Sequence, residues 1–179
     1  MYQALIDFWF SDEAKQYWFK STRSFDQRLI DSYIDTWRQA KQGKLDRWQQ
    51  TAMGSLALVI LLDQFPLNMF RGTAKCFSTD ASSRAVARGS IDKAYDRELT
   101  PDQKSFMYMP FMHSEDLDDQ ALGVELFSQP GLEDNVRFAR HHYGIVERFG
   151  RFPHRNKMLG RESSEAEIIY LNSKEAFRG

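Results

Sequence analysis

Three of the four histidines in the 179-residue chain stand where they could transfer protons or bind a ligand. His113 lies two positions before Glu115, and His154 is followed directly by Arg155. A helical wheel at about 100° per residue places His142 in the middle of the apolar face of a predicted helix over 132–149. A histidine on a core face either finds hydrogen-bond partners inside the protein, which is the more common arrangement, or lines a cavity between helices.

A second set of polar residues follows the most apolar stretch of the chain. Leu56–Leu62 is apolar all round, which in a soluble protein is typical of a helix enclosed by other helices. A buried helix that delivers a carboxylate and a guanidinium at its end can form the floor of a polar pocket. The residues that follow the apolar stretch include Asp63, Gln64, Asn68 and Arg71.

These two sets of residues predict one shared polar pocket, which has two alternative uses. In an enzyme of the hydrolase or transferase type, the general base would be His142 or His113. In a binding protein, arginines would clamp an anionic group. The catalytic candidates are His142, His113, Asp63 and Glu115, and the ligand-binding candidates are Arg71, Asn68, Gln64, Arg151, His154, Arg155 and Asn156.

A metal site is a third use of the same residues. Its nominal ligands would be His113, Glu115, His142 and His154, but their spacing is unlike compact ligand motifs such as HExxH. The single cysteine, Cys76, excludes a CxxC motif for metal or redox chemistry. We therefore predict no metal centre.

Charge and hydropathy exclude several classes of partner. The formal net charge of −1 argues against a chain devoted to polyanions. Six basic residues from Arg140 to Arg161, with Glu147 alone between them, suit a basic rim around a small anionic ligand better than a nucleic-acid groove. The first residues lack the basic region of a secretory signal, and the apolar run Ala52–Leu62 is shorter than the ~20 residues that span a bilayer. We expect no membrane contact and a cytoplasmic location.

Helical periodicity and helix-boundary residues run along the whole chain. Thr100-Pro-Asp-Gln103 is a strong helix start, and Gly43 and Gly150 are expected helix ends. No segment shows sustained strand alternation with hairpin residues. We predict one all-α domain over 1–179, with about eight helices in antiparallel neighbours joined by short loops. The expected helices cover about 2–10, 24–42, 46–64, 80–95, 100–109, 114–127, 132–149 and 165–172.

Three long motifs, in order along the chain, resemble those of one protein family. They are Leu-Leu-Asp-Gln-Phe-Pro-x-Asn-Met-Phe-Arg-Gly-Thr-Ala (61–74), Met-Pro-Phe-Met-His-Ser-Glu-Asp (109–116) and Arg-Phe-Gly-Arg-Phe-Pro-His-Arg-Asn (148–156), after an opening Ile-Asp-Phe-Trp-Phe (6–10). Together they are similar to the mostly bacterial family known as domain of unknown function 924. Position 67 departs from the family pattern, since Leu67 stands where the family usually has arginine.

The resemblance implies a fold but no settled activity. It implies a tetratricopeptide-like, right-handed array of stacked helix pairs with a concave surface. The family motifs fall on the polar residues already named as site candidates, which supports a shared pocket without naming its ligand or a cofactor.

Three hypotheses of function remain open. The first is a binding module for a small anionic ligand or peptide, the second is the enzyme, and the third is a structural or protein-interaction scaffold whose motifs fix helix corners. Tetratricopeptide-like folds usually bind rather than catalyse, although this rests on analogy of fold. An apolar N-terminal helix also allows a homo-oligomer.

Overall fold

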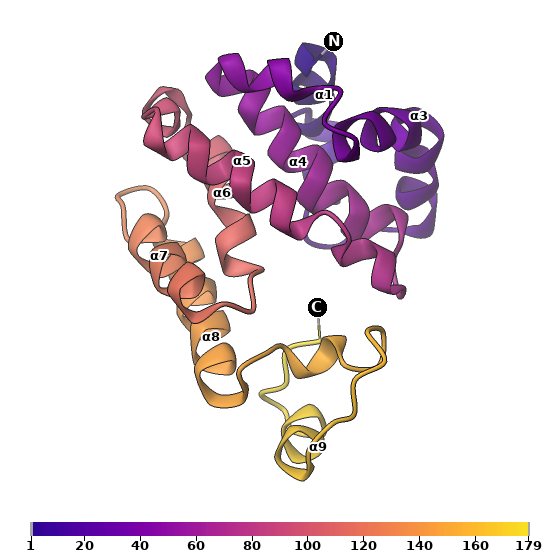
Figure 1. Ribbon diagram of the computed structural model, residues 1–179, viewed down its shortest axis with the longest axis vertical. Coiled ribbons are helices and arrows are strands. Elements are labelled where there is room, and N and C mark those ends of the chain that lie inside the picture. The colour runs from indigo at the N-terminus through magenta and orange to yellow at the C-terminus, as the bar shows by residue number, and fades with distance from the viewer. Residues whose placement is uncertain (1, 179) are drawn as a thin grey trace. The chain divides into compact units, whose positions relative to one another are not determined.

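The computed structural model describes residues 2–178, and over this range the chain is entirely helical, with nine α-helices and no strand (Figure 1). The all-α prediction is confirmed. The α-helices are α1 (Tyr2–Trp9), α2 (Asp12–Lys15), α3 (Arg23–Lys41), α4 (Ala52–Met69), α5 (Asp80–Asp92), α6 (Pro101–Met112), α7 (Leu117–Phe127), α8 (Glu133–Phe149) and α9 (Glu165–Leu171). Four short 3₁₀ helices join them: η1 (Asp46–Gln50), η2 (Ala74–Phe77), η3 (Tyr95–Glu98) and η4 (Pro153–Arg155).

The contacts within the chain divide it into two compact units. Unit 1 comprises the chain up to Arg71 together with Lys75–Pro110, and unit 2 comprises Gly72–Ala74 together with the chain from Phe111 onward. The single domain over 1–179 stays a prediction.

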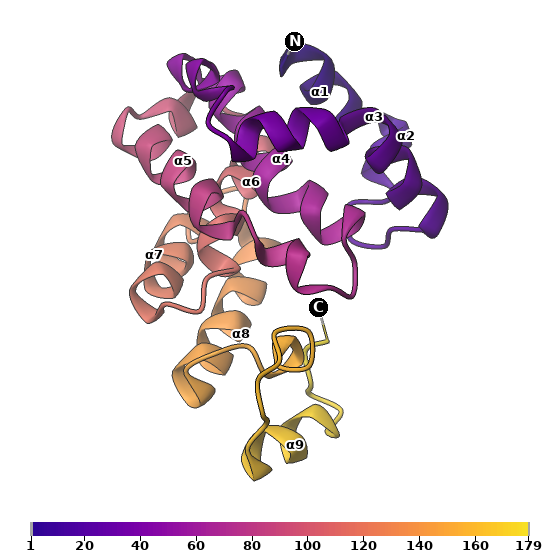
Figure 2. The same cartoon turned by 45° about the vertical axis from the view of Figure 1, so that its right-hand side comes forward.

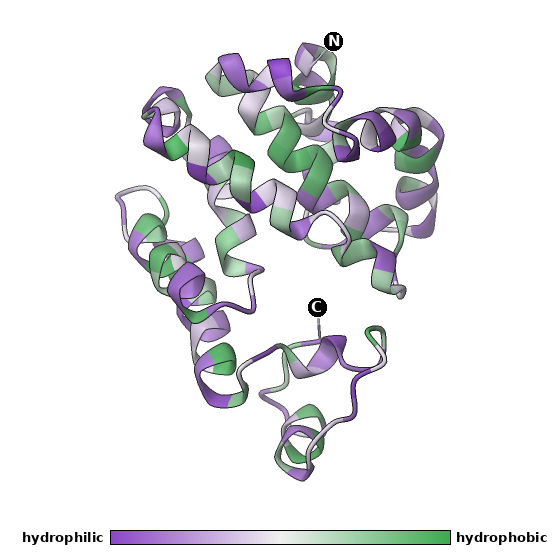
Figure 3. Cartoon of the chain, viewed as in Figure 1, coloured by the Kyte–Doolittle hydropathy of each residue, from purple (hydrophilic) through white to green (hydrophobic). Residues whose placement is uncertain are grey.

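Helix α4 forms the core of unit 1, as its apolar sequence predicts. Apart from Met53 and Leu67, every residue of α4 is buried. It contacts α1, α3, α5 and η1, and Figures 1 and 2 show it among α1, α3 and α5. Figure 3 shows its long hydrophobic stretch. By length and composition α4 could cross a membrane, but 89% of it is buried inside the structure, so core packing accounts for its hydropathy.

The start of α4 differs from the prediction of one helix running from Asp46. The segment Asp46–Gln50 forms η1, and α4 begins only after Thr51, whose extended backbone (φ −138°, ψ 155°) separates the two. The Thr51 hydroxyl accepts a hydrogen bond from the Gly54 amide at 3.1 Å, which makes Thr51 the N-cap. Residue 54 packs so closely against η1 that only glycine fits there, because a Cβ would lie 2.1 Å from the carbonyl oxygen of Trp48.

The prolines inside α4 and α6 do not end these helices, so the predicted helix ends near residues 64 and 109 are wrong. Helix α4 continues past Pro66 to Met69, and α6 continues past Pro110 to Met112. In α4, proline removes the amide that would bond to the Leu62 carbonyl. The Thr79 hydroxyl donates to that carbonyl instead, at 2.6 Å.

Unit 2 is built on α7 and α8, which pack against each other, and on a small core beyond them. Gly150 ends α8 in the left-handed region (φ 68°), as predicted. The chain then passes through η4 to α9, whose N-terminus is closed by a reciprocal capping box between Ser164 and Glu167. The core that joins these elements consists of Ile145, Val146, Phe152 and Tyr170.

Candidate functional site

The structure places the predicted site residues in both units. Asp63, Gln64, Asn68 and Arg71 belong to unit 1. The larger group belongs to unit 2 and consists of His113, Glu115, His142, Arg151, His154, Arg155 and Asn156. The hypothesis of one shared pocket stays a prediction.

In unit 1 the polar residues at the end of α4 mainly hold helices together. Arg71 donates to both carboxylate oxygens of Asp26 on α3, at 2.9 and 3.3 Å, and to the side-chain oxygen of Asn68 at 2.8 Å. Gln64 donates to the buried carboxylate of Asp63. Arg71 thus ties the end of α4 to the start of α3, and its charge is balanced within the unit.

In unit 2 the carboxylate of Glu115 is saturated by three donors. Arg161 donates to its two oxygens at 2.7 and 2.8 Å, and the Phe152 amide donates at 2.8 Å. Burial alone would raise the pKa of Glu115, but the hydrogen bonds from Arg161 and Phe152 outweigh burial and hold that pKa below its usual value. An ionised, fully paired carboxylate is poorly suited to accept a proton or to orient a general base.

Arg155 and Asn156 also serve the scaffold of unit 2. The Arg155 guanidinium is buried, donates to the His113 carbonyl at 2.9 Å and lies 4.7 Å from the centre of the Phe152 ring. Asn156 is 1% exposed and donates to the Ser163 hydroxyl at 3.1 Å. Both side chains hold the turn around η4 in place, although the sequence suggested them as ligand-binding groups.

His142 lies on the buried face of α8, as the helical wheel predicts. Its Nδ1 is 2.8 Å from the Phe138 carbonyl oxygen, so Nδ1 carries the proton and Nε2 carries the lone pair. Its ring centre is 4.4 Å from that of Phe177, which is also 5.0 Å from the ring of His154. Two of the three predicted site histidines are therefore brought together around one aromatic ring.

Burial keeps these two histidines neutral. It lowers the pKa of His142 to about 3, and the nearby histidines lower it further against the effect of the Phe138 carbonyl. Burial and the charge of Arg155 lower the pKa of His154 to about 4. Because such imidazoles are weak bases, the enzyme hypothesis with His142 as general base gains no support from its surroundings. Among residues 2–178 no group of three His, Cys, Asp or Glu side chains has a geometry that could hold a metal ion.

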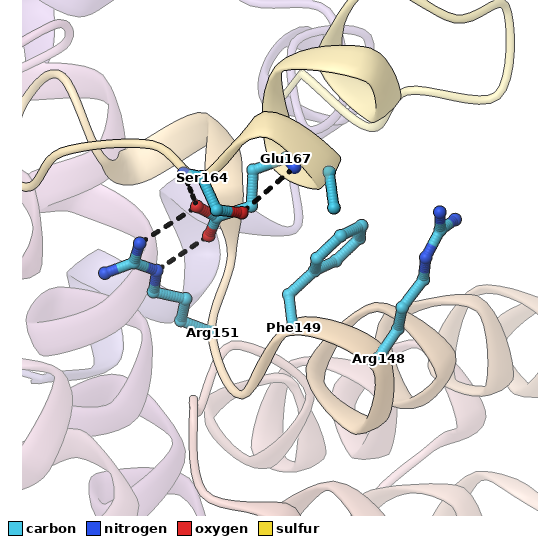
Figure 4. Close-up of a pocket in the computed structure, with 6 residues that line it drawn as sticks. Arg148, Phe149, Arg151, Ser164 and Glu167 are labelled. Atoms are coloured by element: carbon cyan, nitrogen blue, oxygen red, sulfur yellow. Dashed lines mark hydrogen bonds and ion pairs between the residues drawn. The ribbon is translucent and has the colours of Figure 1, made fainter.

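A cleft of about 450 Å³ opens between the end of α8 and α9 (Figure 4). On one side Arg151 donates from Nε and Nη2 to the two oxygens of Glu167, at 2.7 and 2.9 Å. On the other side Arg148 lies over Phe149, 4.7 Å from the ring centre. Within the described range of the chain Arg148 has no ion pair. The lining residues are Arg148, Phe149, Arg151, Ser164, Ala166 and Glu167.

Of these lining residues, sequence reasoning selected only Arg151 as a ligand-binding residue. Glu167 is 2% exposed, and its hydrogen bonds from Arg151 lower its pKa to about 2, against the opposing effect of burial and with help from the Ser164 amide. The sequence signal that could have identified Glu167 is the spacing Ser164-x-x-Glu167, which is typical of a capping box. Its partner Arg151, sixteen residues away, could not be read from that motif.

Replacing Arg151 by Met is expected to destabilise the protein more than the double replacement R151M/E167Q. The single change leaves the Glu167 carboxylate buried without its arginine, whereas the double change removes the buried charge as well. Urea denaturation of R151M, E167Q and the double variant measures this order. Arg148→Met is the control, since Arg148 has no ion pair to lose. If the double variant is less stable than R151M, the buried Glu167 carboxylate does not need Arg151 to offset the cost of its burial.

Comparison with known proteins gives a family but no activity. Residues 5–175 match the family described as bacterial protein of unknown function (DUF924). The chain is also similar to the solved structure of the protein of unknown function ATU0120 from Agrobacterium tumefaciens, with 38% sequence identity, 96% of each chain covered and a TM-score of 0.87. A search of curated proteins finds no match.

Proposed function

The chain belongs to the bacterial DUF924 family, and we propose that it is a binding protein that takes a small anionic ligand or peptide in the cleft between the end of α8 and α9. The observation that carries the proposal is the state of Arg148. Its neighbour across the cleft, Arg151, is neutralised by Glu167, whereas the Arg148 guanidinium lies over the Phe149 ring and forms no ion pair with any residue in the range 2–178. The cleft therefore has an excess positive charge whose N–H groups are directed to solvent or to a ligand.

The dimensions of the cleft agree with this use. Ligand pockets for small molecules are commonly about 300–1,000 Å³ and combine apolar walls with a few polar groups. The cleft has about 450 Å³, an aromatic wall at Phe149 and polar groups at Ser164 and Arg148. These features support binding of an anionic group more directly than proton transfer, because the Glu115 carboxylate is paired with Arg161 and burial lowers the pKa of His142 to about 3.

Two sequence-based expectations belong to the same proposal. The packing of α4 with α5 and of α7 with α8 supports the tetratricopeptide-like pairing of helices. The burial of α4 accounts for its apolar residues without a membrane, which agrees with the proposed cytoplasmic location.

Replacing Arg148 by Gln is expected to weaken anion binding about tenfold or more, because a hydrogen bond to a charged group contributes about 1.5–3 kcal/mol. Thermal-shift titrations with inorganic phosphate, pyrophosphate, citrate and acetate select the anion that stabilises the native chain most, and its Kd is then compared between variants. Arg137→Gln is a closely matched control. Arg137 lies on the same helix and also contacts the ring of the next residue, Phe138, at 5.3 Å, but it does not line the cleft.

Two outcomes would contradict the proposal. In the first, R137Q weakens binding as much as R148Q, which would indicate a general effect of surface charge. In the second, none of the four anions raises the melting temperature of the wild-type protein.

A further inference from the structure

We infer that the anionic group recognised in this cleft is the carboxyl terminus of a peptide or protein whose last residue is apolar. The inference rests on the proposed function and gives the class of its ligand. It follows from three features of the cleft: a charged end, an apolar wall that continues beyond it, and a polar group on the opposite side.

The charged end is Arg148. A guanidinium presents several N–H donors in one plane and matches the two oxygens of a carboxylate. The ring of Phe149 beneath it, 4.7 Å away, holds the guanidinium at the wall of the cleft without using its hydrogen bonds. A terminal carboxylate would replace the water on those donors.

The apolar wall runs from Phe149 to α9. The Phe149 ring packs on Tyr170, with 5.1 Å between the ring centres, and Ala166 lies in the lining of the cleft. Ile169 follows Ala166 by three positions, so the two side chains occupy the same side of the helix. Ile169 is 63% exposed and lies outside the lining of the cleft, so it offers uncovered apolar surface next to Ala166 on the same side of α9. An apolar last side chain placed there would bury this surface.

The opposite side of the cleft favours a peptide over a simple organic acid. Ser164 lies across from Arg148 (Figure 4), and its hydroxyl oxygen accepts from the Glu167 amide at 3.3 Å. Its O–H can donate to a further acceptor, and a peptide carries such an acceptor in the backbone carbonyls before its terminal carboxylate.

The test uses the full chain and a fluorescein-labelled hexapeptide, Gly-Ser-Gly-Ser-Val-Leu, with either a free carboxylate or a carboxamide at its end. Fluorescence anisotropy is expected to show that the free acid binds about tenfold or more tightly than the amide, since a charge-assisted contact is lost. This preference should disappear in R148Q and persist in R137Q. A third peptide, ending in Asp instead of Leu, should bind more weakly than the Leu peptide.

The apolar wall is tested by Ile169→Ser, with Ile168→Ser as the matched control. Because the last side chain of the peptide would bury apolar surface of Ile169, I169S is expected to weaken binding of the free-acid peptide about tenfold. I168S should change binding less, because Ile168 does not share the side of α9 that Ala166 occupies. Both residues are exposed, so neither variant removes a core side chain.

The outcomes separate this inference from the proposed function. Equal binding of acid and amide, or no peptide binding, together with Arg148-dependent binding of one of the small anions, overturns the peptide terminus and leaves the anion site standing. Failure of both the peptides and the small anions overturns both. Stronger binding of the acid that depends on Arg148 and Ile169 supports the inference.

Discussion

Lowering the pH from 6 to 4 is expected to reduce the free energy of unfolding by about 3 kcal/mol through His142 alone, because a group that is protonated only in the unfolded state contributes about 1.4 kcal/mol per pH unit. The pKa of His142 is about 3 in the folded protein, compared with an ordinary value of 6.5. Between these values the unfolded chain binds more protons than the folded chain. The stability is therefore complete above about pH 6.5 and is lost as the pH falls toward 3.

Urea denaturation at pH 7, 6, 5 and 4 measures this dependence in the wild-type protein and in H142Q. The variant cannot take up the proton, so its stability should fall less steeply, by about 1.4 kcal/mol per pH unit between pH 6 and 4. His154, whose pKa is lowered to about 4 by burial, acts in the same direction in both proteins and cancels from the comparison. Equal slopes for H142Q and the wild type would show that His142 is solvated or already charged. An NMR titration of the His142 ring gives the same answer directly.

Replacing Gly54 by Ala is expected to cost about 3 kcal/mol of stability, which is the upper part of the usual range for overpacking a core. Alanine normally improves a helix by roughly 0.5–1 kcal/mol over glycine. Here, however, its Cβ would lie 2.1 Å from the Trp48 carbonyl oxygen and 2.9 Å from the Thr51 hydroxyl oxygen. Trp48 is itself buried, so η1 cannot move away from α4 without disturbing the core of unit 1.

Gly89→Ala is the matched control for this substitution. Gly89 lies inside α5, and a Cβ there would have no neighbouring atom within 4 Å. This variant should gain stability by roughly 0.5–1 kcal/mol, as helix propensity predicts. Thermal or urea denaturation of both variants decides the matter, and a G54A protein as stable as G89A would contradict the close contact between η1 and α4.

Local sequence signals predicted most of the helices, because apolar periodicity and capping residues act within a few positions. Helix α8, its end at Gly150 and the buried place of His142 follow from spacing alone. The break at Thr51 was missed because it depends on the packing of η1 against α4. The continuation of α4 through Pro66 could not be predicted because the compensating hydroxyl comes from Thr79, the residue that precedes α5.

The chemistry of the site was less predictable for a related reason. The sequence shows which arginines and carboxylates are present, but the tertiary fold determines which of them form ion pairs. Glu115 pairs with Arg161, forty-six residues away, and Arg151 pairs with Glu167. These ion pairs neutralise Glu115 and Arg151, two of the residues that the sequence suggested for the site. Arg148, which belongs to the predicted basic run from Arg140 to Arg161, is the arginine on which the proposed anion site depends.

The hydroxyl of Thr79 stands in for the amide that Pro66 lacks, and this exchange links two distant positions in the evolution of the chain. A relative that replaces Pro66 by another amino acid regains the amide, and the hydroxyl at position 79 is then needed only to accept from the Trp37 indole, at 3.4 Å. A relative that keeps the proline and loses the hydroxyl leaves a buried carbonyl without its donor. Substitutions at these two positions are therefore expected to occur together, and an ancestral order in which the hydroxyl came first would be the one that avoids an unstable intermediate.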